Sequence, residues 1–393
     1  MSSKVVTKHG HKVPAHQYST DYAPARSETV IVPSTNTPLF GSQFTIDIRD
    51  LNVVVHDLTM QFNLSAISTM TSGMFVPAQF LVDHIDVVMN GNIIDTYYPL
   101  DQFLQSQLFQ RDEDRALQNT AAGHYASTTQ RIALATGANS YYLPLFDFFR
   151  QAKLVALLEN VHNVQLRVFM NPLANVTSGT GTAVATINSC NLLMRVTRLR
   201  EEEARRLKGE MAVSKALHYK FTDLRTQSNT INSGVSSANI ILSAITGPVA
   251  YLVFVVRPSA SLTGNGAFAF TAIASYEILN NSGQNIVGGQ AINNSEALLV
   301  IGNNNSKSSY LAENALGITN NNANVYVYSF AADAVDSSEN AVSSGVHNFS
   351  GSEQLKINFT SSLGAAVQVD VLAYTEAMLS MTPGGAKKSV YHH

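Results

Sequence analysis

The sequence predicts an all-β protein built from two similar jelly rolls in tandem, and three observations support this fold class. Short runs of alternating apolar and polar residues, rich in β-branched side chains, continue through most of the 393-residue chain. Turns rich in Asn and Gly, such as "NNSGQN" and "GNNNSKSS", separate these runs. Several patterns of the first half return in the same order in the second half. A chain of this length is too long for one ordinary core and suits two.

The internal repeat has a period of about half the chain. Residues 161–169 ("VHNVQLRVF") resemble residues 346–359 ("VHNFSGSEQLKINF"), and upstream of them "YYLPLFDFF" resembles "VYVYSFAAD". The segment "IDVVMNGNII" has a looser partner in "SYEILNNSGQNIV". Such a period indicates a duplicated domain, because solenoid units are about 20 to 50 residues long. We therefore expect two sandwiches or barrels with Greek-key connections.

A hairpin and a helix are the clearest local elements. Asn90 and Gly91 supply the positive φ angles of a tight hairpin turn, and apolar residues lead into and out of it. Pro99 then starts a helix, with Asp101 near its positive end. Its apolar face consists of Leu100, Phe103, Leu104 and Leu108. The later segment "KLVALLE" is compatible with either a helix or a strand.

The charged segment "TRLREEEARRLKGEM" predicts a short helix or a connector. Glu201 with Arg205, and Glu202 with Arg206, form i,i+4 pairs in the favoured order. Because the basic residues already have acidic partners, we interpret the segment as a solvated link between domains. A patch that binds an anionic ligand or nucleic acid is the alternative.

The patterns divide the chain into five segments. Residues 1–28 predict a flexible N-terminal arm, because they lack the apolar periodicity of a foldable core. Residues 29–196 form the first jelly roll and residues 215–383 the second, with the connector over residues 197–214. Residues 384–393 form a short basic C-terminal tail.

Composition restricts the class of function. Charged residues make up 13% of the chain, about half of the usual share. A surface so poor in charge suits burial against neighbouring subunits. The net charge of −3 disfavours nucleic-acid binding by electrostatics. The single cysteine, Cys190, fits folding in a reducing compartment, and we expect neither a signal peptide nor a membrane span.

Residues with metal-binding or catalytic chemistry are scattered. His9 and His11 fall in the arm, and the remaining histidines do not form the array of a cupin-type metal site. Asp112, Glu113 and Asp114 could offer oxygens to a hard cation, but the arginines on both sides favour a self-neutralised loop or helix end.

The remaining motifs also lack a catalytic arrangement. The glycine-bearing loops "GNGAF" and "TSGTGTA" do not match a phosphate-binding loop, and Cys190 has no evident base near it in the sequence. Tyr141 and Tyr142 are the pair that best suits a carbohydrate-binding face, although we expect them to lie in a strand. We therefore predict no enzyme activity and no catalytic, cofactor-binding or metal-binding residues.

The segment "VYVYSFAADAVDSSENAVSSGVHNFSGSEQLKIN" resembles the double jelly-roll major capsid proteins of large eukaryotic DNA viruses. In that family a strand ending in Tyr-Ser-Phe precedes a loop and a Ser-Gly-x-x-Asn-Phe-Ser turn. The matching residues here are Tyr328, Ser329, Phe330, Ser344, Gly345, Asn348, Phe349 and Ser350. Ser343 stands where the family usually has proline, and this chain has no tryptophan, which indicates a distant member.

Further stretches match the family in order, including "IDVVMNGNIIDTYYPLDQFLQ" and "RLREEEARRL", and together they cover most of residues 40–391. The resemblance implies two tandem eight-stranded jelly rolls, a double jelly roll, with short helical insertions. The lineage also includes polinton-like viruses, adenovirus and tailless lipid-containing phages.

The resemblance further implies a major capsid protein of the virion. Three copies would form a homotrimer of six jelly rolls, a pseudo-hexagonal capsomer that tiles an icosahedral shell, commonly over an internal lipid membrane. Its partners would be neighbouring capsomers and vertex and minor capsid proteins, without sequence-specific nucleic acid. Two alternatives stay open at this point: a minor capsid or vertex protein, and a carbohydrate-binding jelly-roll module.

Overall fold

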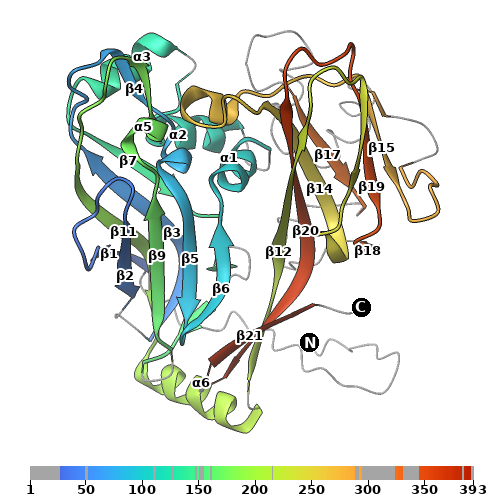
Figure 1. Cartoon of the computed structure of the whole chain (residues 1–393). Coiled ribbons are helices and arrows are strands. Elements are labelled where there is room, and N and C mark those ends of the chain that lie inside the picture. Colours follow the sequence, from blue (N-terminus) through green and yellow to red (C-terminus); the bar gives the residue numbers. More distant parts are fainter. Residues whose placement is uncertain are drawn as a thin grey trace.

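Two β-sandwiches lie side by side in the computed structural model, and the all-β prediction is confirmed (Figure 1). The structure describes residues 27–48, 52–108, 112–125, 127–146, 148–149, 155–159, 162–214, 216–287, 292–293, 324–330, 345–382 and 385–390. The predicted N-terminal arm lies outside these residues apart from its last two positions.

The first sandwich consists of a five-stranded sheet and a four-stranded sheet. One has the strand order β1-β11-β3-β7, and the other has the order β2-β9-β5-β6. The strands of the first sheet are β1 (Ser27–Pro33), β11 (Ile187–Arg198), β3 (Val53–Leu64) and β7 (Asn139–Pro144), with β8 (Val155–Leu157) also pairing with β3. The strands of the second sheet are β2 (Gln43–Ile48), β9 (Val164–Met170), β5 (Val82–Met89) and β6 (Asn92–Tyr97). A separate two-stranded sheet joins β4 (Thr71–Phe75) and β10 (Thr177–Thr180).

The second sandwich repeats this arrangement with the orders β12-β20-β14-β17 and β13-β19-β15-β16. The first of these sheets contains β12 (Leu217–Ile231), β20 (Val367–Thr382), β14 (Thr246–Pro258) and β17 (Val325–Ser329). The second contains β13 (Ser237–Ile241), β19 (Gln354–Asn358), β15 (Ser275–Leu279) and β16 (Ile292–Asn293). Two further strands join the larger sheet: β18 (His347–Ser350) pairs with β14, and β21 (Gly385–Val390) pairs with β20.

Both sandwiches have the same connectivity. When the eight principal strands of each are numbered along the chain, both give sheets of order 1-8-3-6 and 2-7-4-5. This is an eight-stranded jelly roll with Greek-key connections. The predicted repeat is confirmed for three strands, because β9 corresponds to β19, β7 to β17 and β5 to β15. The counterpart of β6 is β16, which lies after the segment that the sequence matched.

One part of the predicted repeat lies at different positions relative to the strands of the two jelly rolls. His162 lies just before β9, whereas His347 lies in β18, the counterpart of β8. In the second jelly roll the turn of residues 351–353 separates the Val-His-Asn sequence from the strand that contains Gln354. The shared tripeptide therefore occupies different positions, while the Gln-Leu-basic sequence after it occupies the same strand in both jelly rolls.

The predicted hairpin and first helix are present. Asn90 and Gly91 have φ angles of 49° and 85° between β5 and β6. Helix α1 (Pro99–Leu108) follows, and "KLVALLE" contributes strand β8. The other helical insertions are η1 (Ala78–Leu81), α2 (Asp112–Ala121), α3 (Thr128–Ala135), α5 (Leu173–Val176) and η2 (Gly264–Phe268).

The charged segment forms helix α6 (Glu201–Ser214), which connects the two jelly rolls (Figure 1). Arg205 pairs with Glu201 at 2.5 Å, as predicted. The second predicted pair is wrong, since Arg206 pairs with Glu210 at 2.6 Å. Arg206 has an acidic residue four positions away on either side, so sequence spacing alone did not distinguish the two. Leu207 is fully buried and anchors the helix to the core.

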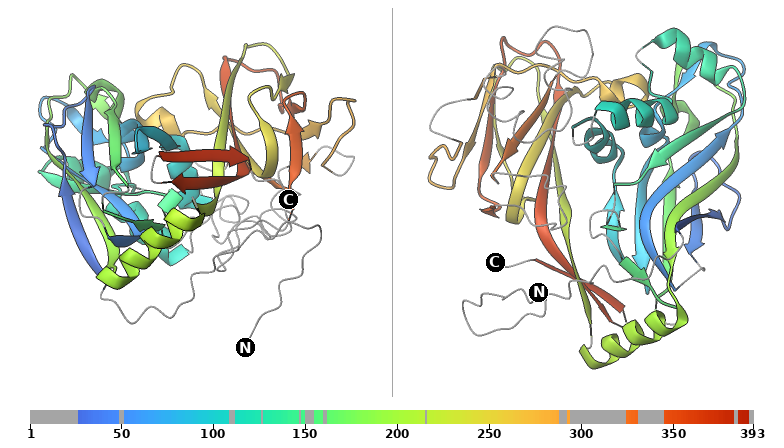
Figure 2. Two further views of the ribbon diagram at one scale, coloured as in Figure 1. Left: turned by 90° about the horizontal axis from the view of Figure 1, so that it is seen from below. Right: turned by 180° about the vertical axis from the view of Figure 1, so that it is seen from behind.

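The four sheets lie roughly one behind another across the molecule. Their order is β1-β11-β3-β7, β2-β9-β5-β6, β12-β20-β14-β17 and β13-β19-β15-β16, and the front, rear and lower views agree (Figures 1 and 2). The third sheet is therefore buried on both faces. One face packs in the core of the second jelly roll, with Leu252 and Phe254, and the other packs against the first jelly roll, with Tyr251 and Val253.

Candidate functional site

Cys190 does not form a reactive centre in the described structure. Cys190 is fully buried on β11, and burial raises the pKa of its thiol well above the usual value. A protonated, enclosed thiol is a poor nucleophile. His9 and His11 lie outside the described residues. Among the residues that the structure does describe, no group of three or more His, Cys, Asp or Glu side chains could hold a metal ion.

Four other histidines that the sequence suggested, His124, His162, His218 and His347, each contact a different partner. His124 stacks on Phe103 with ring centroids 5.4 Å apart, while the ring of His162 accepts a hydrogen bond from the backbone N–H of Leu158. Burial lowers the pKa of each of these two histidines to about 4, so both are neutral at pH 7. His218 contacts Ser380, and His347 stacks on Phe330.

The acidic cluster and the tyrosine pair have structural positions. Helix α2 begins at Asp112, as the helix-end interpretation predicts, and Glu113 and Asp114 are exposed on its first turn. Tyr141 is buried and Tyr142 half-buried on strand β7, where a strand position was predicted for both. Tyr141 therefore belongs to the core, which removes half of the proposed carbohydrate-binding pair.

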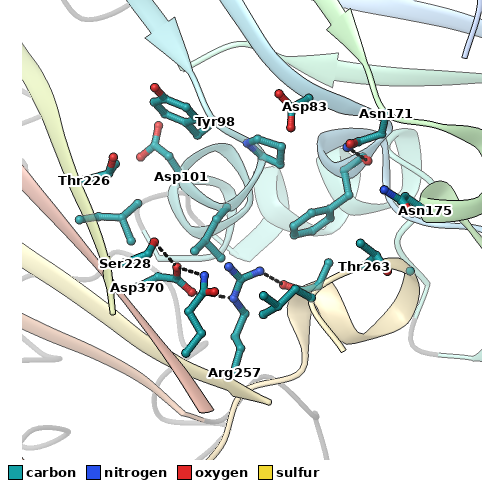
Figure 3. A pocket seen from close by; sticks show the side chains of 18 of the residues that line it. Asp83, Tyr98, Asp101, Asn171, Asn175, Thr226, Ser228, Arg257, Thr263 and Asp370 are labelled. Atoms are coloured by element: carbon teal, nitrogen blue, oxygen red, sulfur yellow. Dashed lines mark hydrogen bonds and ion pairs between the residues drawn. The ribbon is translucent and has the colours of Figure 1, made fainter. Parts of the chain in front are cut away.

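A cleft of about 450 Å³ with both polar and apolar lining residues lies between the two jelly rolls (Figure 3). The first jelly roll contributes one wall and the second contributes the other. The polar residues of the two walls are Asp83, Tyr98, Asp101, Asn171 and Asn175 on one side, and Thr226, Ser228, Arg257, Thr263, Gln368 and Asp370 on the other.

Arg257 and Asp370 form a nearly buried ion pair on the second wall. The Nε atom of Arg257 lies 2.7 Å from Asp370, and the two side chains are 11% and 7% exposed. Ser228 Oγ and Gln368 Nε2 each donate to Asp370 Oδ1 at 2.6 Å. The guanidinium also donates to the carbonyl of Ala267 at 3.1 Å, which connects β14 to η2. Such an enclosed pair is stable because the surrounding hydrogen bonds offset the loss of water.

Asp101 on α1 connects the two walls. Its carboxylate accepts a hydrogen bond from the hydroxyl of Tyr374 on β20, and Tyr374 stacks on Tyr251 with ring centroids 4.2 Å apart. Burial raises the pKa of Asp101 to about 6, although the hydrogen bonds from Tyr374 and neighbouring glutamines oppose the shift. The contact crosses the jelly-roll boundary with the carboxylate enclosed.

A second cluster of charged residues lies at the boundary between the two jelly rolls, where β6, β12 and β21 meet. Lys388 on β21 pairs with Asp223 on β12 at 2.5 Å, and it lies 5.9 Å from the ring centre of Phe221. Asp95 on β6 faces this pair and accepts hydrogen bonds from two backbone N–H groups. Burial raises the pKa of Asp95 to about 7, with Lys388 acting in the opposite direction. The predicted basic tail therefore places one of its lysines in an ion pair with β12.

Element η2 inserts from the second jelly roll into the first. The Phe268 ring packs against Phe80 and Phe103 with centroids 5.5 and 5.8 Å away. Arg131 of α3 lies over the same ring at 5.5 Å and donates to Asn265 at 2.8 Å. The two jelly rolls are thus joined by aromatic packing at this end of the interface, as well as by the polar contacts of the cleft.

These contacts give the boundary a structural role. The acidic groups of the cleft already have partners, namely Arg257 for Asp370, Tyr374 for Asp101 and His84 for Asp83. In the second cluster, Lys388 pairs with Asp223. Sequence reasoning named Asp101 only as an acidic residue near the start of a helix, and it predicted none of these pairings. A usable signal was present, because Arg257 and Asp370 are isolated charges in the nearly continuous apolar runs "AYLVFVVRP" and "VQVDVLAY".

The strand order found twice in this chain decides the fold. The chain is a double jelly-roll protein. Its helices within the described residues include none that is long and apolar enough to span a membrane.

Solved structures with the same fold cover nearly the whole double jelly-roll chain. The VP54 protein of PBCV-1, in a structure fitted into a reconstruction of the virophage Sputnik, has a TM-score of 0.70 and 16% identity, and the match covers 94% of this chain and 98% of that one. The Faustovirus major capsid protein has a TM-score of 0.67 and 9% identity, with 97% and 93% covered.

The mavirus major capsid protein has a TM-score of 0.51 and 12% identity, with 100% and 97% covered. No protein-family model and no curated protein sequence matches the chain. The likeness is one of fold, and it confirms the predicted double jelly roll.

Proposed function

We propose that the double jelly-roll protein is a major capsid protein that forms trimeric, pseudo-hexagonal capsomers of an icosahedral virus shell. The observation that carries the proposal is the presence of two complete jelly rolls of identical connectivity in one chain. PBCV-1 VP54 and the Faustovirus major capsid protein share this architecture over more than 90% of both chains. Three such chains supply six similar units, the number that a hexagonal tile requires.

The joined boundary supports this role. The Arg257–Asp370 pair, the Asp101–Tyr374 contact and the Phe268 insertion hold the two jelly rolls against each other. A tile needs such a connection, because six units meet around one centre in a constant geometry. The low share of charged residues, 13%, suits the large interfaces that a shell buries.

The proposed partners follow from the shell. The protein contacts itself within the capsomer, neighbouring capsomers, and vertex and minor capsid proteins, over an internal lipid membrane. It belongs to the virion, binds no specific nucleic-acid sequence and carries no enzyme activity. We keep the division into an arm (1–28), two jelly rolls (29–196 and 215–383), a connector (197–214) and a tail (384–393) as part of the proposal.

Mass measurement of the purified protein tests the proposal. We expect light scattering to detect a species of three 42.5-kDa chains at micromolar concentration, and electron microscopy to show hexagonal outlines. A monodisperse monomer contradicts a capsomer. A trimer found in purified particles in a few copies per virion identifies a minor capsid or vertex protein instead. Specific binding on a glycan array, together with a monomeric state, identifies a carbohydrate-binding module.

A further inference from the structure

Four side chains of the cleft between the two jelly rolls have no hydrogen-bond partner in the described part of the chain. They are Tyr98 and Asn175 of the first jelly roll, and Thr226 and Thr263 of the second. The carboxylates and the guanidinium group of the same cleft are already paired. The hydrogen-bonding groups that are left for a ligand are therefore uncharged.

These four side chains lie in two pairs on opposite sides of the cleft (Figure 3). Tyr98 and Thr226 lie on one side, and Asn175 and Thr263 lie on the other. Each pair takes one residue from each jelly roll. A ligand that contacts both pairs would therefore bridge the two jelly rolls at two places.

Much of the remaining lining of the cleft is apolar. Pro99 and Leu100 contribute from the first turn of α1, Leu262 from the segment before η2, and Leu372 from β20. Tyr98, which is 42% exposed, adds an aromatic ring. A few polar groups on an apolar lining are the usual composition of a small-molecule site. The volume of about 450 Å³ lies toward the lower end of the range for such sites, about 300 to 1,000 Å³.

The chemistry of the four free groups selects a class of ligand. A hydroxyl group both donates and accepts, and an asparagine amide offers two donors and one acceptor. An ammonium ion only donates and a carboxylate only accepts, so each matches part of what these groups offer. Alcohol hydroxyls match all of it. An anion is also repelled by Asp83 and Asp101, because Arg257, the basic residue of the described lining, already pairs with Asp370.

We propose that the cleft binds a small, uncharged polyhydroxylated ligand, a sugar of the size of one pyranose ring. Its hydroxyl groups bond to Tyr98 and Thr226 at one side and to Asn175 and Thr263 at the other. Its C–H face lies against the Tyr98 ring and the apolar lining. One chain supplies all of these residues, so the inference does not depend on the capsomer.

Saturation-transfer NMR on the full-length protein tests the proposal. The probes are the methyl glycosides of glucose, galactose and mannose. The comparison ligands are 1,4-diaminobutane as a cation and glutarate as an anion. We expect saturation transfer to at least one glycoside, with weaker or no transfer to the two charged ligands.

Variants locate the bound glycoside. Thr226→Val and Thr263→Val each remove a hydroxyl group from opposite sides of the cleft, and both positions are exposed. We expect each to raise the dissociation constant at least about threefold, as the loss of one neutral hydrogen bond does. Tyr98→Ala also removes the ring, and we expect at least about a tenfold rise. The matched control is Thr120→Val, at an exposed position of α2 outside the cleft lining.

The possible outcomes separate clearly. Glycoside binding that both threonine variants weaken, and that Thr120→Val leaves unchanged, supports the proposal. Absence of transfer to all three glycosides overturns it, and so does binding that no cleft variant changes. A preference for 1,4-diaminobutane or glutarate overturns the assignment of an uncharged ligand. If Tyr98→Ala does not fold by circular dichroism, the two threonine variants decide. Light scattering on the same samples reports the capsomer separately.

Discussion

At the scale of single residues, Glu353 organises the turn that follows β18. Its carboxylate is 5% exposed and accepts hydrogen bonds from the backbone N–H groups of Ser350, Gly351 and Ser352 at 3.0 to 3.2 Å. Gly351 has a φ angle of +84°, which favours glycine. Burial alone would raise the pKa of Glu353, but the backbone and hydroxyl donors lower it overall. The Glu353 carboxylate and the positive φ angle of Gly351 therefore together fix the turn before β19.

Glu353→Gln should lower the free energy of unfolding by about 1–3 kcal/mol at pH 7, because the uncharged amide accepts these N–H groups less strongly. The folded pKa of Glu353 lies below its unfolded value, so its contribution is present above the unfolded pKa and is lost as pH falls through the folded pKa. Urea unfolding at pH 7 and pH 3 should show a smaller difference between wild type and variant at pH 3. The exposed control Glu113→Gln should change little at either pH.

Asp101 predicts the opposite pH dependence. Its folded pKa of about 6 lies above the ordinary 3.8, so the neutral form stabilises the fold. That contribution is complete below the unfolded pKa and is lost as pH rises through about 6. One pKa unit corresponds to about 1.4 kcal/mol, so the loss is on the order of 2–3 kcal/mol.

Asp101→Asn retains an acceptor for Tyr374 and does not ionise. We expect its free energy of unfolding to depend less on pH between 4 and 7.5 than that of wild type, as measured by urea unfolding. Equal slopes for both proteins would show that Asp101 does not titrate in this range.

At the scale of elements, η2 joins the two jelly rolls through Phe268. The ring contacts Phe80, Phe103 and His124 of the first jelly roll, although η2 belongs to the second. Contacts of this kind make two domains unfold as one cooperative unit, because the unfolding of one jelly roll removes stabilising contacts from the other.

Phe268→Ala should lower the free energy of unfolding by about 2–3 kcal/mol, less than for a fully buried Phe because the ring is half-buried. We also expect the calorimetric transition to broaden or split as the jelly rolls uncouple. The matched control is Phe359→Ala, which removes a buried ring from the core of the second jelly roll alone. It should destabilise that jelly roll without weakening the boundary, and a Phe268 variant with one sharp transition would contradict the joining role of η2.

At the scale of the whole molecule, the distribution of charge at the two ends of the chain is unequal. Both Lys387 and Lys388 are exposed on β21, and Asp223 offsets the charge of Lys388. The arm contributes Lys4, Lys8 and Lys12 from the sequence. Basic residues near an anionic membrane contribute about 1 kcal/mol each, so most of any such attraction should come from the arm.

Deletion of residues 1–24 should leave trimers intact and impair the assembly of closed shells. The deleted residues lack a foldable apolar pattern, so they add little to the stability of the jelly rolls and act between capsomers. Light scattering measures the trimer and electron microscopy counts the shells, with full-length protein as the control. An unchanged yield of closed shells would show that the arm is not needed for assembly.

Sequence by itself determined the features that depend on neighbouring residues. The Asn90-Gly91 hairpin and the helix from Pro99 were predicted because turn geometry and helical periodicity are local properties. The duplicated jelly roll was predicted because the order of several strand patterns repeats along the chain. Family resemblance then supplied the number of strands.

Tertiary structure alone decided which elements cover one another. Hydrophobic periodicity reports that a residue is buried, but it does not identify the element that buries it. Asp101 and Tyr374 are 273 positions apart and meet because α1 packs on the outer face of β20. The same packing buries both faces of β14, whose continuous apolar run otherwise suits several arrangements. Contacts between distant segments depend on how whole sheets stack, and a single sequence holds no local signal of that stacking.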